Sequence, residues 1–443
     1  MAVIHNKGWH NPARILVLSY LFLIFIGTIL LKCPFTLKEP ISWLTAFFTA
    51  TSATTVTGLL TVFNGDVFSP AGHIVILLLI QLGGLGIMTI AVIVFSALNI
   101  PISIHQKLMI QEALNQHSIS GIMRLVRRLF VFSAFFEGFF AILLAIRLIP
   151  EWGWGRGLSY AGFLSVSAFN NAGITFWPDS LSHYVGDVTI NILISALVIL
   201  GGIGFTVMND IWDKKRWRAF SLHTKLMIIG TVILNVIGTV VIFLIERDNA
   251  KTLGNLPMGE AMLAAFFQEA MTRSAGFNTV DISSLEPASL FFMIMYMFIG
   301  SGSVSTGGGI KLTTFLCLMA MVSAFIKRKK APVILGRTIH RYDIYKALTV
   351  TLLSIGVIFS ALFLLLLFEQ PGMSFLKIAF ETVSAFGTTG LSAGVVSHLS
   401  PMGQVVLSLM MIFGKLGPLT FLFSVAQREN DAIRYPHGKL FIG

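Results

Sequence analysis

The chain has 443 residues, of which 55% are hydrophobic and only 12% are charged. Soluble domains carry about 25% charged residues, so this composition excludes a water-soluble globular protein, and its hydrophobicity excludes a disordered one. The net charge of +11 could indicate nucleic-acid binding, but basic residues that flank membrane spans are the simpler explanation. Two cysteines, Cys33 and Cys317, are too few for a disulfide framework or a cysteine-rich metal site.

Long apolar runs predict eight membrane-spanning segments. The first run could be a signal peptide, but it is longer than an ordinary one and no small-x-small cleavage site follows, so we interpret it as a retained span. The sixth run is too long for one straight span and is interrupted by a glycine-rich stretch. The eight predicted spans cover residues 13–32, 73–98, 129–149, 188–207, 226–245, 290–325, 347–368 and 402–425.

Lysine and arginine residues concentrate in the two terminal segments and in the connections that follow the even-numbered spans. Cytoplasmic segments of membrane proteins carry this excess of positive charge. Both termini are therefore predicted to face the cytoplasm.

Each odd-numbered connection contains a short apolar stretch that cannot cross a bilayer, followed by a glycine in a polar run. When the connections are aligned on that glycine, a phenylalanine stands ten residues before it and a small residue stands six before it. A further glycine follows 24 to 28 residues later. Self-similarity at a fixed period is the signature of internal repeats. The aligned glycines are Gly58, Gly173, Gly276 and Gly390, the phenylalanines are Phe48, Phe163, Phe266 and Phe380, the small residues are Ser52, Ser167, Ala270 and Ser384, and the later glycines are Gly83, Gly201, Gly300 and Gly414.

The expected fold class is an all-α polytopic membrane protein with eight transmembrane helices and four re-entrant pore loops. Each repeat reads as span, re-entrant helix, polar loop and span, and four parallel repeats can surround a pseudo-fourfold central pore. Irregular backbone at membrane depth is tolerated where it lines a wet cavity, and rings of carbonyl oxygens can replace the hydration shell of a cation. The predicted repeats are 1–104, 105–218, 219–335 and 336–443, the last including a C-terminal tail.

The four polar loops are predicted to form an ion-binding filter. One such glycine alone would favour helix packing or a tight turn, whereas four in register favour a filter. The predicted filter residues are Thr55, Val56, Thr57, Gly58, Asn170, Asn171, Ala172, Gly173, Arg273, Ser274, Ala275, Gly276, Gly387, Thr388, Thr389 and Gly390. With these loops, the eight-span plan, the broken sixth span and the segment 414–418, the whole chain resembles the Trk/Ktr/HKT superfamily of potassium transporters.

The resemblance is closest to the membrane subunits of bacterial Ktr systems, and it implies potassium uptake across the cytoplasmic membrane. In that family, glycine at all four marked positions accompanies potassium preference. The loops lack a repeated Thr-Val-Gly-Tyr-Gly, so we expect an asymmetric set of ion sites. Sodium dependence, with sodium as an activator, stays open.

The resemblance also implies a homodimer and a cytosolic ring of nucleotide-binding, RCK-type (KtrA-like) regulatory subunits. The cytoplasmic segments are too short for a nucleotide-binding domain, so nucleotide is expected only on that ring and no cofactor is expected in this chain. Membrane lipid is a further expected partner, and nucleic acid is not. Residues 433–443 are short and amphipathic, and we expect them to dock at the dimer or ring interface, although a frayed end is the alternative.

Charged residues inside a membrane are costly and are candidates for function. Arg273 lies in the third loop, where a bare guanidinium would repel a cation. We therefore expect it to turn away from the axis and to form a salt bridge with Glu269 and Glu381. Lys415 could extend to the inner interface, whereas the resemblance implies a positive residue facing the pore below the filter.

The glycine-rich break in the sixth span lacks the Walker pattern and does not follow a strand, so it does not predict a phosphate-binding loop. A static kink would explain it, whereas the resemblance implies a movable loop under the filter. We expect it to form a gate together with Lys415. The predicted gate residues in the loop are Gly300, Ser301, Gly302, Ser303, Val304, Ser305, Thr306, Gly307, Gly308 and Gly309.

No HExxH motif occurs, and no acid-base partners stand out near the serines of the glycine-rich stretch, so the chain is not expected to be an enzyme. A membrane-embedded enzyme is a remote alternative, and an alternating-access cation symporter is a closer one. Transporters of that kind often contain inverted repeats, whereas these repeats run parallel. The pattern therefore favours a fixed, channel-like pathway.

Overall fold

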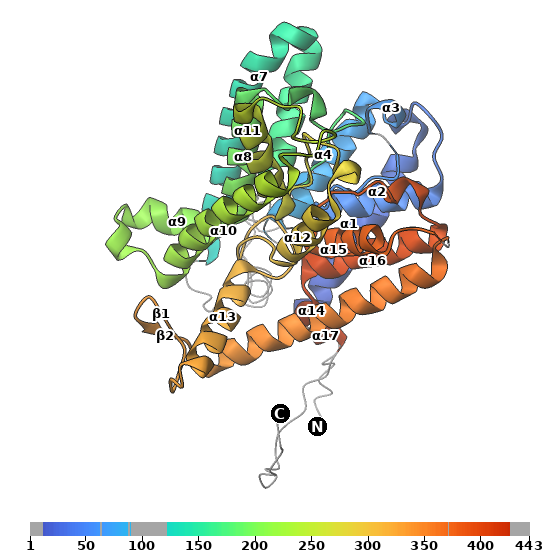
Figure 1. Cartoon of the computed structure of the whole chain (residues 1–443). Coiled ribbons are helices and arrows are strands. Elements are labelled where there is room, and N and C mark those ends of the chain that lie inside the picture. The colour runs from blue at the N-terminus through green and yellow to red at the C-terminus, as the bar shows by residue number, and fades with distance from the viewer. Residues whose placement is uncertain (1–11, 63, 87–88, 90–121, 371, 426–443) are drawn as a thin grey trace, which may run out of the picture.

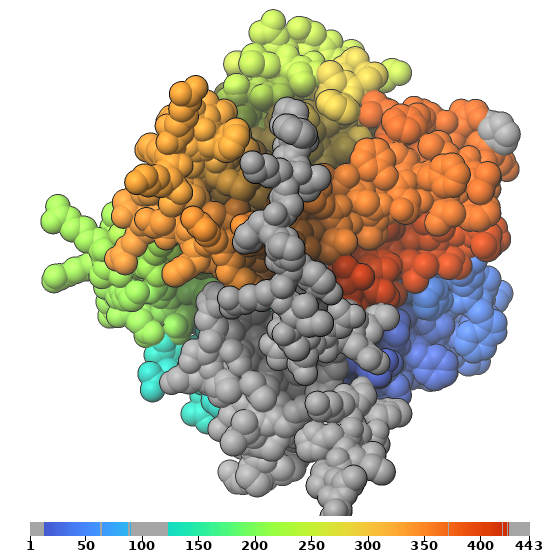
Figure 2. All heavy atoms as spheres, turned by 90° about the horizontal axis from the view of Figure 1, so that it is seen from below, coloured from blue at the N-terminus to red at the C-terminus, as the bar shows by residue number. Residues whose placement is uncertain are grey.

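Helices make up most of the computed structural model, which describes residues 12–62, 64–86, 89, 122–370 and 372–425 (Figure 1). The first described helix packs against the last one, so the two ends of the described chain lie on the same side of the bundle. Viewed from that side, α13 (Leu312–Ile326) and α14 (Arg341–Phe368), in orange, cover much of the face, and α9 (Phe205–Lys214), in green, projects at its edge (Figure 2).

Four long apolar helices open the four repeats. By length and composition alone, four described helices could each cross a membrane, or five if one bent pair counts as a single span. Helix α7 contains both a span and the helix that follows it, joined at Gly153, whose φ of 76° is not helical. The four helices are α1 (Pro12–Lys32), α7 (Ile122–Phe169), α10 (Leu222–Glu246) and α14 (Arg341–Phe368).

Four shorter helical segments follow the long ones, and each ends a few residues before one of the aligned glycines. The last turns of three of them are buried throughout, at 48–55, 267–272 and 380–387. Helices of this length cannot cross a bilayer, so they match the predicted re-entrant helices. They are α2 (Trp43–Thr55), the part of α7 beyond Gly153, α11 (Met258–Thr272) and α15 (Phe375–Gly387).

The last span is broken in repeats 2, 3 and 4, and this corrects the predicted continuous spans 188–207 and 402–425. Gly86, Gly204 and Gly417 end the outer segments with φ of 83°, 102° and 80°, values that interrupt a helix. The predicted span 73–98 continues beyond the described residues. The outer segments are α4 (Pro70–Leu85), α8 (Val188–Ile203), α12 (Pro287–Phe298) and α16 (Pro401–Leu416), and the segments after the breaks are α9 (Phe205–Lys214), α13 (Leu312–Ile326) and α17 (Pro418–Val425).

The breaks differ in length among the repeats. Helices α8 and α9 meet at 90° with one residue between them, whereas α12 and α13 are separated by residues 299–311. The interruption predicted at 300–309 is therefore present, and it is longer by one residue at its start and two at its end. Hydropathy alone does not show the shorter breaks, because a glycine inside an apolar run reads as part of the span.

Short elements complete the described chain and lie between the larger helices. A two-residue hairpin follows α13 and is antiparallel, with Val333 opposite Thr338. The remaining elements are η1 (Pro34–Thr36), α3 (Asn64–Val67), η2 (Ser182–Tyr184), η3 (Trp217–Ala219), η4 (Ile282–Ser284), β1 (Val333–Ile334), β2 (Arg337–Thr338) and η5 (Val396–His398).

A buried acid near the outer end of the long helix holds the start of the last span in repeats 3 and 4. Glu246 Oε1 accepts a hydrogen bond from the backbone nitrogen of Glu286 at 2.9 Å. Glu369 accepts from the backbone nitrogen and the hydroxyl of Ser400, the N-cap of α16. A carboxylate at a helix N-terminus satisfies free N–H groups and interacts favourably with the helix dipole.

The core forms a ring, because each apolar cluster joins neighbouring repeats. One cluster includes Phe48 of repeat 1 with residues of repeats 3 and 4, and a second joins repeat 2 to Phe267 of repeat 3. A third joins repeats 1 and 2 through Phe68 and Phe163. Of the aligned phenylalanines, Phe48, Phe163 and Phe380 are buried and Phe266 is half-buried, in agreement with packing roles.

Gly83 tests the close packing of the last span against a re-entrant helix. A Cβ at Gly83 would overlap the carbonyl oxygen of Thr54, whereas a Cβ at Gly138, also within a helix, would meet nothing within 4 Å. We expect Gly83→Ala to lower the free energy of unfolding by about 1–3 kcal/mol, as overpacking does. Gly138→Ala should be neutral or stabilising. Thermal unfolding of the purified protein in detergent measures both, and equal effects would contradict this packing.

Candidate functional site

Four glycines lie at the centre of the bundle with backbone angles that favour glycine. The φ angles of Gly58, Gly173, Gly276 and Gly390 are 96°, 66°, 69° and 87°. Side chains rarely adopt this region, so each position demands glycine on conformational grounds. These four residues are called the ring glycines below.

Each ring glycine lies against the next repeat, and the contacts close into a cycle. A Cβ added to any of them would overlap a carbonyl oxygen of the residue that precedes the next ring glycine. Following the contacts leads from repeat 1 to 2, 3, 4 and back to 1, so the four polar loops form a closed ring. The contacts are Gly58 with Ala172, Gly173 with Ala275, Gly276 with Thr389 and Gly390 with Thr57.

A serine six residues before the ring glycine holds three of the four loops. In repeats 1 and 4 its hydroxyl accepts a hydrogen bond from the ring-glycine nitrogen, at 2.9 and 3.2 Å. In repeat 2 it accepts from the nitrogen of the next residue, at 3.0 Å. Ala270 occupies this position in repeat 3 and has no hydroxyl. The serines are Ser52, Ser167 and Ser384.

The third loop also differs from the others in its backbone. The residue two positions before the ring glycine has a positive φ in repeats 1, 2 and 4, where it is Val56 (53°), Asn171 (60°) and Thr388 (47°). At the same position in repeat 3, Ser274 has no positive φ. The helical turn continues instead, because the nitrogen of Ala275 donates to the carbonyl of Met271 at 3.0 Å. The ring is therefore fourfold in its contacts but not in its detail.

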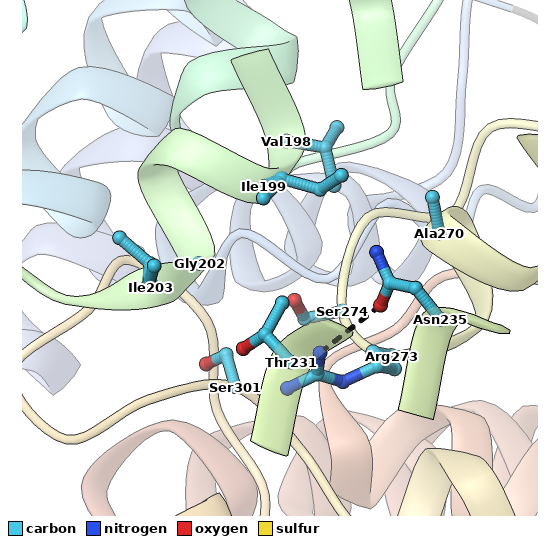
Figure 3. Close-up of a pocket in the computed structure, with 10 residues that line it drawn as sticks. All are labelled: Val198, Ile199, Gly202, Ile203, Thr231, Asn235, Ala270, Arg273, Ser274 and Ser301. Atoms are coloured by element: carbon cyan, nitrogen blue, oxygen red, sulfur yellow. Dashed lines mark hydrogen bonds between the residues drawn. The ribbon is translucent and has the colours of Figure 1, made fainter. Parts of the chain in front are cut away.

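Arg273 is buried behind the third loop and is not paired with an acid (Figure 3). Its Nη1 donates to Asn235 Oδ1 of α10 at 3.4 Å, and its Nε has no hydrogen-bond partner. No ion pair among the described residues joins Arg273 to Glu269 or Glu381. The predicted salt bridge is therefore wrong.

The two acids have other surroundings, which explains the error. Glu381 Oε1 accepts hydrogen bonds from the Ser392 hydroxyl at 2.7 Å and from the Ala393 nitrogen at 2.8 Å. It therefore anchors the chain that follows the fourth loop. Glu269 packs against Gly238 of α10, where a Cβ would overlap its Cγ, and its carboxylate makes no hydrogen bond. The i,i+4 spacing to Arg273 places the two charges near each other without contact.

A small cavity lies beside Arg273, between the third loop and the break after α12 (Figure 3). Its volume is about 20 Å³, and Thr231, Ser274 and Ser301 contribute hydroxyl groups to its lining. A water molecule needs about 10–15 Å³. The cavity can therefore hold about one water between the third loop and Ser301 of the break.

Residues 299–311 form an irregular loop, called the gate loop below, that touches the repeats on both sides. Toward repeat 2, the nitrogen of Gly302 donates to the carbonyl of Gly202 at 2.8 Å. Toward repeat 4, the nitrogen of Gly308 donates to the Thr388 hydroxyl at 2.8 Å. Because Thr388 belongs to the fourth polar loop, the gate loop contacts the ring directly.

Two lysines bind neighbouring carbonyls of the gate loop. Lys311 Nζ donates to the carbonyl of Gly307 at 2.6 Å, and Lys415 Nζ donates to the carbonyl of Thr306. The sequence predicted a gate role for Lys415 but missed Lys311. Its signal was an isolated lysine inside an apolar run, which is costly in a membrane. The structure thus places two cationic groups on one short stretch of backbone.

Backbone oxygens and hydroxyl groups are what this site can offer to an ion. Among the described residues, no group of three or more His, Cys, Asp or Glu side chains could hold a metal ion. Monovalent cations are instead bound by rings of carbonyl oxygens. Helices α2, α11 and α15 end at the ring, so the negative ends of their dipoles lie near it.

If the two lysine contacts hold the gate loop, removing either of them should make the loop more mobile. We expect Lys311→Gln and Lys415→Gln each to increase amide hydrogen exchange over 299–311, because each removes a charge-assisted hydrogen bond worth about 1.5–3 kcal/mol. Lys327→Gln at the exposed end of α13 is the control and should leave this exchange unchanged. Exchange measured by mass spectrometry on the purified protein tests this. Unaltered protection in both gate variants would show that the lysines do not hold the loop.

Comparison with known proteins agrees with the fold. The family model described as "TrkH: Cation transport protein" matches residues 7–434. The chain is 45% identical to "Ktr system potassium uptake protein B" of Bacillus subtilis (strain 168), over 98% of this chain and 97% of that protein. It is 40% identical to the Vibrio alginolyticus protein of the same name, over 99% and 96% of the two chains. It is 34% identical to "Potassium/sodium uptake protein NtpJ" of Enterococcus hirae, over 98% and 97%.

The crystal structure of the potassium transporter TrkH from Vibrio parahaemolyticus has the same fold, with a TM-score of 0.76 at 19% identity over 96% of this chain and 87% of that one. These findings confirm the predicted fold class of a helical polytopic membrane protein with pore-loop repeats. They also confirm a transport protein and not an enzyme. The chain belongs to the TrkH family of cation transport proteins.

Proposed function

We propose that this protein takes up potassium through a channel-like filter made by the four polar loops. The closed cycle of contacts between each ring glycine and the next loop is the observation that carries the proposal. Four loops held at one level can present rings of carbonyl oxygens to a dehydrated cation. The relatives named as potassium uptake proteins support potassium as the cargo.

The gate loop controls the pathway below the ring in this proposal. It joins repeats 2 and 4 through hydrogen bonds, and Lys311 and Lys415 hold its backbone. At an effective dielectric near 20, a cation about 4 Å from either ammonium would meet roughly 4 kcal/mol of repulsion. A closed gate loop therefore obstructs the path both by its bulk and by its charge. Opening requires the loop to leave at least one lysine contact.

The pathway works as part of a larger assembly in the cytoplasmic membrane. Two relatives are named as components of a Ktr system, which supports a multi-component system here. We propose a homodimer, with a pore in each protomer, and a cytosolic RCK-type ring that binds nucleotide and acts on the gate loop through α13. Both termini face the cytoplasm, and the predicted docking segment 433–443 lies outside the described residues. The repeat boundaries near 104, 218 and 335 give each repeat one polar loop.

The alternating-access symporter is the competing mechanism. It needs the filter region to open to each side in turn, whereas the ring joins all four repeats in one closed cycle of tight contacts. A relative named for potassium and sodium uptake keeps sodium as a candidate activator or second cargo. We therefore propose a fixed filter and a moving gate, and the closed ring of contacts supports the fixed filter.

Growth complementation and ion-flux measurements test the proposed function. The gene is expressed in a bacterium that lacks potassium uptake, and fluxes of potassium, rubidium and sodium are measured in cells and in proteoliposomes. We expect rescue of growth at low potassium and a flux that prefers potassium and rubidium over sodium. Correct membrane insertion without rescue and without flux would overturn the proposal.

Replacing a ring glycine tests the filter itself. Gly58→Ser places a side chain at a φ of 96° and against the carbonyl oxygen of Ala172, so the carbonyl ring must shift. We expect the potassium-to-sodium selectivity ratio to fall by about tenfold or more, equivalent to about 1.4 kcal/mol. Gly394→Ser is the matched control, because Gly394 has a φ of 86° but is exposed and its Cβ would meet only Ser283 Cβ, at 3.4 Å. Equal selectivity in both variants would refute the filter assignment.

Shortening the gate loop tests the gate. Deletion of part of 302–308 should raise potassium flux several-fold and leave the selectivity ratio nearly intact, because the ring itself is unchanged. Lys415→Gln should also raise flux by removing one charge, whereas Lys415→Arg keeps the charge and should behave like the parent. Flux in proteoliposomes measures all three. Parent-like flux in the deletion and the Gln variant, at normal expression, contradicts a gate here.

A further inference from the structure

A polar cluster lies behind the second polar loop, and the proposed function does not use it. Glu137 stands at its centre, on the long helix α7 and partly buried, with apolar residues such as Phe135, Phe136 and Phe139 around it in sequence. A carboxylate inside a membrane span is costly unless its oxygens are well satisfied, so its presence calls for a reason.

The Glu137 carboxylate accepts hydrogen bonds from three side chains on three segments. Its Oε1 accepts from the Ser133 hydroxyl at 2.7 Å, from Asn170 Nδ2 at 3.0 Å and from Gln81 Nε2 at 3.1 Å. Asn170 Nδ2 also donates to Gln81 Oε1 at 2.9 Å. Gly84 makes room for this amide, because a Cβ there would overlap Asn170 Oδ1. The three donors therefore hold the carboxylate through Oε1 and tie α4, α7 and the second loop together.

Asn170 carries the contact to the ring. It is three residues before Gly173, and the next residue, Asn171, has a φ of 60° that turns the chain into the loop. Asn170 Nδ2 also donates to the carbonyl of Val166 in the last helical turn, at 2.9 Å. A shift of this side chain therefore moves the end of the re-entrant helix and the start of the second loop together.

The other repeats lack this arrangement at the position of Asn170. Thr55 bonds within its own loop, to Thr57 at 2.8 Å, and Gly387 has no side chain. Arg273 reaches only the amide oxygen of Asn235, at 3.4 Å. Among the described residues, the second loop is thus the one that is anchored to a carboxylate through this position.

Glu137 is not half of an ion pair, because none of the ion pairs among the described residues includes it. Its carboxylate is instead held by neutral donors, three of which meet at Oε1. On the basis of the proposed function, we infer that Glu137 is a positioning residue that holds the second filter loop through Asn170 and thereby sets the discrimination between potassium and sodium.

Glu137→Gln tests the inference with little change of shape. The substitution replaces one carboxylate oxygen by an NH2 group, which cannot accept hydrogen bonds from the neighbouring donors, so the hydrogen bond from Asn170 weakens. We expect the potassium-to-sodium selectivity ratio in proteoliposomes to fall by about tenfold, or about 1.4 kcal/mol. Ser133→Ala removes one donor and should give a smaller fall in the same direction. It carries the test if Glu137→Gln does not fold.

A double-mutant cycle with Asn170→Ala tests the route. If Glu137 acts through Asn170, the double variant should lose no more selectivity than the more affected single variant, whereas independent roles would make the losses multiply. Glu246→Gln is the matched control, because Glu246 is an acid of another long helix, α10, and likewise accepts three hydrogen bonds, from Asn249, Thr252 and Glu286. It should lower thermal stability and leave the ion ranking unchanged.

The outcomes separate this inference from the proposed function. A parent protein without potassium flux overturns the proposed function. A selective parent with an equally selective Glu137→Gln variant overturns the inference alone, and so does a Ser133→Ala variant of parent selectivity when Glu137→Gln does not fold. Multiplying losses in the double variant would overturn the route through Asn170, as would a change of ion ranking in Glu246→Gln as large as that in Glu137→Gln.

Discussion

Carbonyl oxygens of each polar loop occupy the space where a side chain of the preceding ring glycine would stand, and the rest of the molecule is arranged around this contact. For the loops to meet in this way, the re-entrant helices that precede them must end at the same depth. The long helices of the four repeats surround these short helices. The later glycines Gly83, Gly201 and Gly414 extend the same logic, because they let the last spans lie directly against the ends of the re-entrant helices. Close approach of backbones is a general use of small residues in membranes.

Repeat 3 departs from this plan in several linked ways. Ala270 replaces the anchoring serine, Ser274 lacks the left-handed backbone, and Gly300 packs against Gly308 of the gate loop instead of a re-entrant helix. The same repeat carries the long break, so the space released near the ring is taken by the gate loop and by the cavity beside Arg273. The contacts of the ring glycines keep their fourfold cycle, whereas the backbone of the third loop and the long break do not follow the other repeats.

The four loops could be predicted because their backbone leaves a mark in the sequence. Only glycine tolerates the φ angles of Gly58 and Gly390 at low cost, so the alignment found them. Partners of buried side chains leave no such mark. Whether Arg273 meets Glu381 depends on whether backbone nitrogens already occupy that acid, as they do here. Breaks at single glycines inside apolar runs, such as Gly204, were missed because hydropathy does not report backbone angles.

The glycine breaks have a mechanical consequence. A continuous helix would transmit torque to the ring as a rigid rod, whereas a residue such as Gly204 or Gly417 can absorb rotation by changing its own φ and ψ. Two of the segments after the breaks also connect to the gate loop, because α13 follows it in the chain and the backbone nitrogen of Phe205 in α9 donates to the carbonyl of Val304 at 2.9 Å. Movement of α9 or α13 therefore has a route to the ring through the gate loop and its hydrogen bond to Thr388.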